Sequence, residues 1–137
     1  MSTAVPTPTH LLKILVVDDQ PGVCTALTEI LELAGHEVVC TTDGRLALTL
    51  LGTTARDSDL VIADLVMPNL DGIGLILEMN QRYPRIPVIA ISGGGQGDAS
   101  LYLKTAKALG AVAVVKKPFS IDVILAAVEA AAKARPR

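Results

Sequence analysis

The chain has 137 residues, half of them apolar and only 2% aromatic, and its formal net charge is −2. This length suits one domain with a core of aliphatic side chains. The negative charge argues against nucleic acid or an anionic membrane as partner, because neither polyanion would attract the chain. The N-terminal segment lacks the apolar core of a signal peptide, and no apolar run approaches the roughly 20 residues of a spanning helix. We therefore expect a cytoplasmic protein.

Five apolar strands alternate with five helices in the predicted secondary structure. Residues 1–12, which are rich in Thr and Pro, are expected to be disordered, with the folded domain at 13–133 and a short tail at 134–137. Strands are predicted at 13–17, 37–40, 59–63, 87–91 and 111–115, because each is a short apolar run bounded by turn residues. Helices are predicted from 23 to Gly35, and after Asp43, Asp71, Asp98 and Ser120.

The β–α alternation predicts an α/β fold, a doubly wound parallel sheet of five strands with helices on both faces. Its inner strands are apolar on both sides, as expected for strands that are covered above and below. The helix after Asp71 is expected to bury Ile73, Ile76 and Leu77. The last helix is expected to bury one apolar face: Ile124, Ala127, Val128 and Ala131.

Polar residues follow the predicted strands at the edge of the sheet where ligands bind in open α/β folds. They are three carboxylates, one hydroxyl and two ammonium groups: Asp18, Asp19, Asp64, Ser92, Lys116 and Lys117. Two carboxylates 4 Å apart repel by about 4 kcal/mol at an effective dielectric near 20. A divalent cation relieves this repulsion, and all-oxygen ligation suits Mg²⁺. With a hydroxyl and a lysine to hold phosphoryl oxygens, Asp64 is predicted to be a nucleophile that forms an aspartyl phosphate.

Several short motifs together resemble a known family. They are the acidic pair after Val16-Val17, the Asp64 stretch with its Pro and Gly, the serine that closes the fourth strand, and a Lys-Pro-Phe sequence: Asp18-Asp19, Asp64…Met67-Pro68…Asp71-Gly72, Ser92 and Lys117-Pro118-Phe119. In this order and spacing the chain resembles a response-regulator receiver domain of two-component signalling, of the chemotaxis response regulator type, from about Lys13 to Lys133. The resemblance implies a flavodoxin-like (βα)5 fold with strand order 2-1-3-4-5.

The resemblance also implies a Mg²⁺ site at the acidic cluster. Asp64 would be the phosphoacceptor and a metal ligand. Asp19 would bind Mg²⁺ directly, whereas Asp18 would act mostly through a metal-bound water. The backbone carbonyl of Val66 would complete the protein ligands.

Two further residues would hold the phosphoryl group by the same resemblance. Ser92 would donate a hydrogen bond to a phosphoryl oxygen, and Lys117 would pair with the phosphate and precede Pro118 through a cis bond. The chain departs from the family at Val114, where activated receivers usually carry an aromatic ring that rotates inward. The glycines that follow Ser92 are a hypothetical substitute for that ring, since they let the loop and the next helix move as a unit.

The predicted function is that of a stand-alone, single-domain response regulator. It would take a phosphoryl group from a histidine kinase or a histidine phosphotransfer protein, and either switch protein contacts or pass the group along a phosphorelay. The output surface would be the helix after Asp98, the strand 111–115 and the helix after Ser120, with Tyr102, Lys104 and Lys107. The domain is expected to be a monomer or weak homodimer that turns over only its own Asp64 phosphate.

Two alternative functions use related chemistry or a related fold. A haloacid-dehalogenase-like phosphatase also has a Mg²⁺-bound nucleophilic Asp, but it needs a second Asp two residues later, where this chain has Val66. A flavodoxin-like FMN carrier is disfavoured by the acidic edge and the scarcity of aromatic residues. Neither alternative accounts for the full set of motifs.

The cysteine and histidine residues are predicted to have structural roles only. Cys24 and Cys40 do not form a C-x-x-C motif, so they are expected to be reduced thiols that pack in the interior. His36 is expected only to mark the end of a helix. No metal site is predicted from them.

Overall fold

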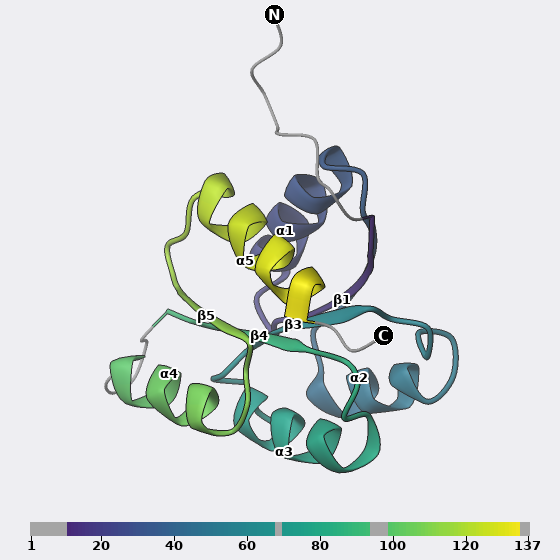
Figure 1. The fold of residues 1–137 in the computed structure, drawn as a ribbon, viewed down its shortest axis with the longest axis vertical. Coiled ribbons are helices and arrows are strands. Elements are labelled where there is room, and N and C mark those ends of the chain that lie inside the picture. The colour runs from purple at the N-terminus through teal and green to yellow at the C-terminus, as the bar shows by residue number, and fades with distance from the viewer. Residues whose placement is uncertain (1–10, 68–69, 94–98, 135–137) are drawn as a thin grey trace, which may run out of the picture.

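A computed structural model describes residues 11–67, 70–93 and 99–134 of the chain. Strands and helices alternate throughout these ranges, as predicted (Figure 1). No helix in the described part of the chain has both the length and the apolar character to cross a membrane. The elements are β1 (Lys13–Val17), α1 (Pro21–Leu33), β2 (Glu37–Thr41), α2 (Gly44–Leu51), β3 (Leu60–Asp64), α3 (Gly72–Arg82), β4 (Val88–Ser92), α4 (Ala99–Ala108), β5 (Ala113–Lys116) and α5 (Ile121–Ala134).

The strands form one parallel sheet in the order β2-β1-β3-β4-β5. This order confirms the predicted flavodoxin-like topology. β1 and β3 lie side by side in the middle of the sheet, and Val17 of β1 pairs with Ala63 of β3. The carboxyl ends of these two strands therefore meet at one edge, which is why Asp18, Asp19 and Asp64 come together.

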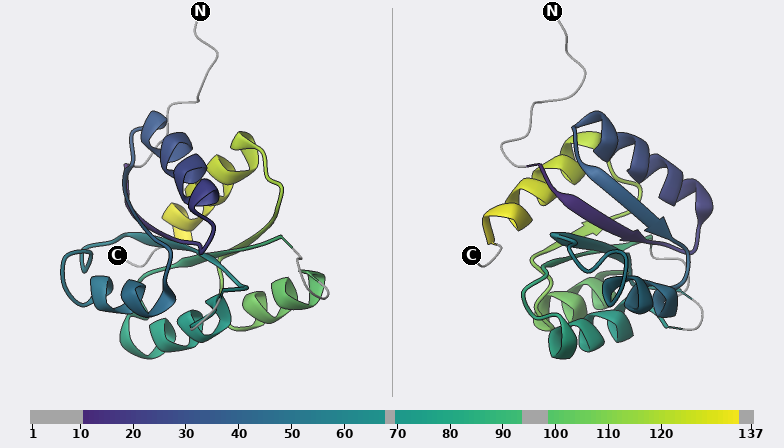
Figure 2. Two further views of the ribbon diagram at one scale, coloured as in Figure 1. Left: turned by 180° about the vertical axis from the view of Figure 1, so that it is seen from behind. Right: turned by 90° about the vertical axis from the view of Figure 1, so that its right-hand side faces the viewer.

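Helices cover the sheet on both faces. α1 and α5 lie on one side and α2, α3 and α4 on the other, as the views in Figures 1 and 2 show. Alternate residues of each inner strand point into one of two aliphatic cores, so that Ile62 joins the core under α1 and α5 and Val61 the opposite core. The predicted buried face of α5 is confirmed, since Ile124, Ala127 and Val128 are all buried, with Ala131.

Side-chain caps begin several of the helices. The Asp43 carboxylate accepts hydrogen bonds from the first turn of α2, and the Asp71 carboxylate accepts one from the N–H of Gly74 at 2.9 Å. The hydroxyl of Ser120 accepts a hydrogen bond from the N–H of Val123 at 3.2 Å, at the start of α5. These bonds satisfy N–H groups that have no partner inside the helix. The predicted cap Asp98 lies outside the described residues.

Leu12, in the segment that the sequence predicts to be disordered, packs against the domain beside His36. Leu12 is buried, and its backbone N–H donates a hydrogen bond of 3.1 Å to Nδ1 of His36. His36 is itself buried, so it is a structural partner of the chain entry and not merely a marker of a helix end. Most of the predicted disordered lead, residues 1–10, lies outside the described residues.

The predicted inner face of α3 was partly wrong. Leu77 is 49% exposed, whereas Leu75 and Met79 are buried beside Ile76. This helix has apolar residues almost all round its first two turns, so the sequence does not define a single apolar stripe. The orientation is decided by packing against the sheet and α2.

Candidate functional site

Three carboxylates meet at the edge of the sheet where the central strands end. Asp18 and Asp19 directly follow β1, and Asp64 is the last residue of the neighbouring strand β3. Each offers a ligand oxygen, and these oxygens all lie within 4.8 Å of one another. The convergence predicted for the acidic residues is therefore present in the structure.

The environment of this cluster fits a hard divalent cation. Asp18 is fully buried and Asp64 is 4% exposed, so water compensates their charge poorly. Oδ2 of Asp18 lies 2.9 Å from Nζ of Lys117, and beyond this ion pair no hydrogen bond from the described residues reaches that oxygen. Three carboxylates with one ammonium leave a negative excess. Oxygen ligands of this kind are the ones that Mg²⁺ prefers.

Lys117, which directly follows β5, contributes a cation to the cluster. Its Nζ lies 2.9 Å from Oδ2 of Asp18 and 3.1 Å from Oδ2 of Asp64. It also donates a hydrogen bond of 3.0 Å to Oε1 of Gln20. The peptide bond to Pro118 is cis, as predicted, and the neighbouring Lys116 is exposed. Lys117 therefore points to the acidic cluster and Lys116 does not.

Gln20 is a site residue that the sequence did not reveal. Its backbone N–H donates a hydrogen bond of 2.9 Å to Oδ1 of Asp18, and its side chain accepts one from Lys117. One residue thus contacts both members of the Asp18–Lys117 pair. A polar residue directly after the acidic pair was the only signal in the sequence, and it is also typical of an ordinary helix entry.

Asp64 is held by partners on both carboxylate oxygens. Oδ1 accepts a hydrogen bond of 3.1 Å from the backbone N–H of Val66, and Oδ2 faces Lys117. Burial raises the pKa of Asp64 above its usual value, and the nearby Asp18 charge adds to the rise, while Val66 and Lys117 oppose it. A carboxylate whose charge is incompletely compensated favours the approach of a further cation.

The pKa of Lys117 is raised in the same cluster. Burial acts to lower it, but the carboxylates of Asp18 and Asp64 outweigh burial. Lys117 is therefore an ammonium at neutral pH. It is placed to pair with an anion that reaches Asp64.

Ser92 lies on the strand beside Asp64, where it was predicted. It is the fully buried last residue of β4, and the strand register pairs Asp64 with Ile91, one residue before it. Its backbone carbonyl accepts a hydrogen bond of 2.8 Å from the N–H of Lys117. Ser92 thus belongs to the same edge as Asp64 and Lys117. The glycine-rich loop that follows, residues 94–98, lies outside the described residues.

Gly72 allows α3 to begin directly against the end of β3. A Cβ atom on Gly72 would lie 2.2 Å from the carbonyl oxygen of Asp64 and 2.7 Å from Cα of Leu65. Such distances are far below van der Waals contact, so only glycine fits there. The residue is a packing requirement of the site.

The cysteine prediction was wrong. Cys24 and Cys40 are joined by a disulfide, with their Cα atoms 6.1 Å apart, and are not two reduced thiols. The first turn of α1 packs against the end of β2, and this contact brings together two cysteines that lie 16 residues apart in the sequence and form no C-x-x-C motif. Sequence spacing could not have revealed this proximity.

Comparisons with known proteins agree with this geometry. Residues 14–129 match the family model of the response regulator receiver domain. Response regulator SaeR of Staphylococcus aureus is 35% identical over 112 residues, which cover 82% of this chain and 45% of SaeR. The chain therefore spans about half the length of this curated relative.

Solved structures give the same result. A response regulator receiver domain protein from Clostridium thermocellum superposes with a TM-score of 0.83 at 27% identity, covering 90% of this chain and 96% of that one. The receiver domain of NtrX from Brucella abortus gives a TM-score of 0.80 at 32% identity, covering 88% and 98%. These relatives lend no support to the haloacid-dehalogenase alternative. The chain belongs to the response regulator receiver domains of two-component signalling.

Proposed function

We propose that this receiver domain accepts a phosphoryl group on Asp64 from a phosphohistidine of a histidine kinase or a histidine phosphotransfer protein. The observation that supports this most is the buried Asp64 carboxylate, which shares the Lys117 ammonium with Asp18 inside a cluster of three acids. Phosphorylation would switch protein contacts or pass the group along a phosphorelay. The setting is the cytoplasm, and the domain acts as a monomer or weak homodimer.

The transfer step exchanges one bond to phosphorus for another. A carboxylate oxygen of Asp64 bonds to phosphorus while the P–N bond to the donor histidine breaks, and the imidazole nitrogen leaves with the bonding electron pair. The donor reaches the edge beside an open, largely apolar pocket next to Lys117, lined by Val23, Gly93, Lys117, Pro118 and Phe119. Such a surface suits the side chain of an incoming protein.

The chain's own groups neutralise the phosphoryl oxygens. The Lys117 ammonium, which already contacts Oδ2 of Asp64, pairs with one of them. The Ser92 hydroxyl donates a hydrogen bond to another from the neighbouring strand. Asp18, Asp19, Asp64 and the Val66 carbonyl would hold Mg²⁺, which supplies positive charge for the phosphoryl oxygens when it is bound.

The output surface is proposed to be the face of α4, β5 and α5. Lys104 and Lys107 of α4 are exposed, and the side chain of Tyr102 lies outside the described residues. Val114 is half-buried against the core on the α2–α4 side. With no ring at this position, the transmitted change is a movement of α4. The glycine-rich loop that the sequence suggested would move with it lies outside the described residues.

Phosphorylation by small-molecule phosphodonors tests this function. Wild-type protein with Mg²⁺ should gain the mass of one phosphoryl group, and Asp64→Asn should gain none. Asp122→Asn, a change at an exposed acid of α5, serves as the matched control and should be labelled like the wild type. A label that survives Asp64→Asn would refute the assignment of Asp64.

Turnover of added phosphate esters distinguishes a receiver domain from the phosphatase alternative. A receiver domain should release no phosphate from small phosphate esters in a steady-state assay, because no general acid stands at position 66. Sustained turnover that Asp64→Asn abolishes would favour an enzyme instead. A purified protein with no flavin colour would exclude an FMN carrier.

A further inference from the structure

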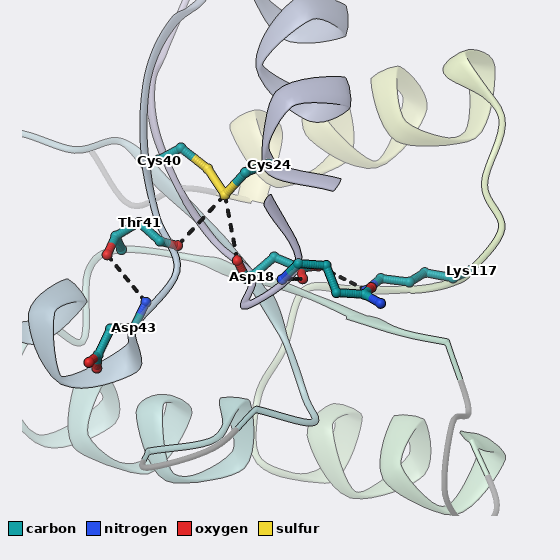
Figure 3. The surroundings of a disulfide bond; sticks show 7 residues. Asp18, Cys24, Cys40, Thr41, Asp43 and Lys117 are labelled. Atoms are coloured by element: carbon teal, nitrogen blue, oxygen red, sulfur yellow. Dashed lines mark hydrogen bonds and ion pairs between the residues drawn. A yellow bond between two sulfur atoms is a disulfide. The ribbon is translucent and has the colours of Figure 1, made fainter. Parts of the chain in front are cut away.

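The disulfide lies directly behind the acidic pair. Cys24 is in the first turns of α1 and Cys40 is next to the end of the edge strand β2, and the bond joins these two elements (Figure 3). Sγ of Cys24 lies 3.6 Å from the backbone carbonyl oxygen of Asp18 and 3.7 Å from that of Thr41. The bond therefore contacts the backbone of a residue whose carboxylate is in the candidate metal site.

Thr41 connects the Asp18 backbone with the start of α2. Its carbonyl oxygen accepts a hydrogen bond of 3.1 Å from the N–H of Asp18, and its hydroxyl accepts one of 3.3 Å from the N–H of Asp43, the cap of α2. Cys40 immediately precedes Thr41, as Figure 3 shows. A change at Cys40 therefore reaches the Asp18 backbone through the Cys40–Thr41 peptide bond and the hydrogen bond from the Asp18 N–H to the Thr41 carbonyl oxygen.

Both redox states fit this environment. A disulfide sulfur carries no proton, so with the bond intact the two carbonyl contacts of Cys24 are packing contacts. After reduction, the Cys24 thiol gains a proton and finds two acceptors already within reach. Cys24 also lies in the aliphatic core with Leu27 and Leu31, where a free thiol packs as a small apolar group.

One sulfur is more accessible than the other. Cys24 is 7% exposed, whereas Cys40 is half-buried on an edge strand that has a neighbour on one side only. An external thiol or disulfide therefore meets Cys40 first. In proteins of reducing compartments, disulfides are usually transient or redox-sensing.

We propose that Cys24 and Cys40 are a reversible redox pair that sets the Mg²⁺ affinity of the acidic site. This inference rests on the proposed function. The oxidised state holds the first turns of α1 and the end of β2 against the Asp18 carbonyl, so less motion is lost when the cation binds. The reduced state frees these two elements from each other and binds Mg²⁺ more weakly.

The oxidant is a disulfide compound, either a small molecule or another protein. The Cys40 thiolate attacks one sulfur of that disulfide, forms a mixed disulfide and releases one thiol. The Cys24 thiolate then displaces the second thiol and closes the Cys24–Cys40 bond. Two protein thiols lose two electrons and two protons in total, and the external disulfide becomes two thiols.

A Mg²⁺ titration of the full chain in both redox states tests the proposal. The protein is equilibrated with oxidised or reduced glutathione, its free thiols are counted by alkylation and mass spectrometry, and binding is followed by amide NMR signals of Asp18 and Asp19. We expect reduction to weaken Mg²⁺ binding by about tenfold, the lower end of the effect of outer contacts on a metal ligand. The double variant Cys24→Ala/Cys40→Ser should bind Mg²⁺ with the affinity of the reduced wild type, and this affinity should be the same in oxidised and reduced glutathione.

Two results would overturn the proposal. One is an equal Mg²⁺ midpoint in the oxidised and reduced protein, and the other is a bond that cannot be reduced or re-formed without unfolding, as judged by the same NMR spectra. Either result leaves phosphorylation of Asp64 standing, because that is measured separately with phosphodonors. If Mg²⁺ shifts no signal in either state, the redox inference fails, and a further failure to label Asp64 would reject the proposed function as well.

Discussion

Lys117 and Asp18 form an ion pair across 2.9 Å in which the Asp18 carboxylate is fully buried. The resemblance implies that Lys117 pairs with a phosphoryl group on Asp64, and in the unphosphorylated chain its ammonium contacts the carboxylates of both Asp18 and Asp64. Lys117 therefore has a structural role before any phosphoryl group arrives. It partly compensates the charge of the cluster at the site where a further cation and a phosphoryl group would bind.

Replacement of Lys117 by Ala should destabilise the metal-free protein. Removal of one partner leaves a buried carboxylate uncompensated, at a cost of about 2 kcal/mol in the free energy of unfolding, less than for a fully buried pair because 14% of the Lys117 side chain is exposed. Added Mg²⁺ should narrow the gap between variant and wild type, because the cation replaces the missing positive charge. Urea unfolding with and without Mg²⁺ measures both effects.

The control for this variant is Lys116→Ala. Lys116 is the exposed neighbour of Lys117, so its loss should change the free energy of unfolding by no more than about 0.5 kcal/mol. An equal loss of stability in the two variants would contradict a specific role for Lys117. So would a gap that Mg²⁺ leaves unchanged.

The location of the site could be predicted from sequence because parallel strands end at a common edge. Asp18, Asp64 and Ser92 each follow or close an apolar run, and topology alone brings such residues together. Their individual contacts could not be predicted in the same way. The pairing of Lys117 with Gln20 depends on how the β1–α1 turn packs, which no residue pattern reports.

The features missed by the sequence analysis depend on contacts between elements. The Cys24–Cys40 bond needs the first turn of α1 to lie against β2, and the burial of His36 needs the chain entry at Leu12 to pass over it. The exposure of Leu77 is another such case, because several apolar residues of α3 compete for its inner face. Local periodicity carries no information on any of these choices.

Reduction of the disulfide should also lower global stability. The bond closes a loop between cysteines 16 residues apart, and a loop of this size restricts the unfolded chain enough to contribute about 3 kcal/mol. Urea unfolding of oxidised and reduced wild-type protein should show that difference. The double variant Cys24→Ala/Cys40→Ser should unfold with the same free energy in both redox buffers; a redox-dependent change in this variant would point to another cause.

Acid should destabilise the protein through His36. Burial lowers the pKa of His36 below 6.5, although the Glu129 carboxylate acts in the opposite direction. The unfolded chain therefore binds a proton more readily than the folded chain. The stability that neutral His36 provides is fully present above pH 6.5, and it declines as the pH falls below 6.5 towards the lower folded pKa.

The variant His36→Gln isolates this effect. Its side-chain oxygen can accept the N–H of Leu12 in place of Nδ1, but it does not titrate. Between pH 6.5 and 5 its free energy of unfolding should fall less steeply than that of the wild type, by at most about 1.4 kcal/mol per pH unit. Chemical denaturation at a series of pH values measures the two slopes. Equal slopes for the variant and the wild type would show that protonation of His36 does not contribute to the loss of stability in acid.

Replacement of Gly72 by Ala tests the close approach of α3 to Asp64. The new methyl group would lie 2.2 Å from the Asp64 carbonyl oxygen, and relief of that overlap must move either the helix start or the end of β3. We expect a loss of about 2–3 kcal/mol in the free energy of unfolding, as for other overpacked sites, together with slower labelling by phosphodonors.

Gly22→Ala is the matched control, since nothing lies within 4 Å of its added methyl group. That substitution should be neutral or stabilise the protein by up to about 1 kcal/mol and leave labelling unchanged, because alanine restricts the unfolded chain. If Gly72→Ala kept both stability and labelling at wild-type levels, the tight contact between α3 and the Asp64 backbone would not be needed for the site.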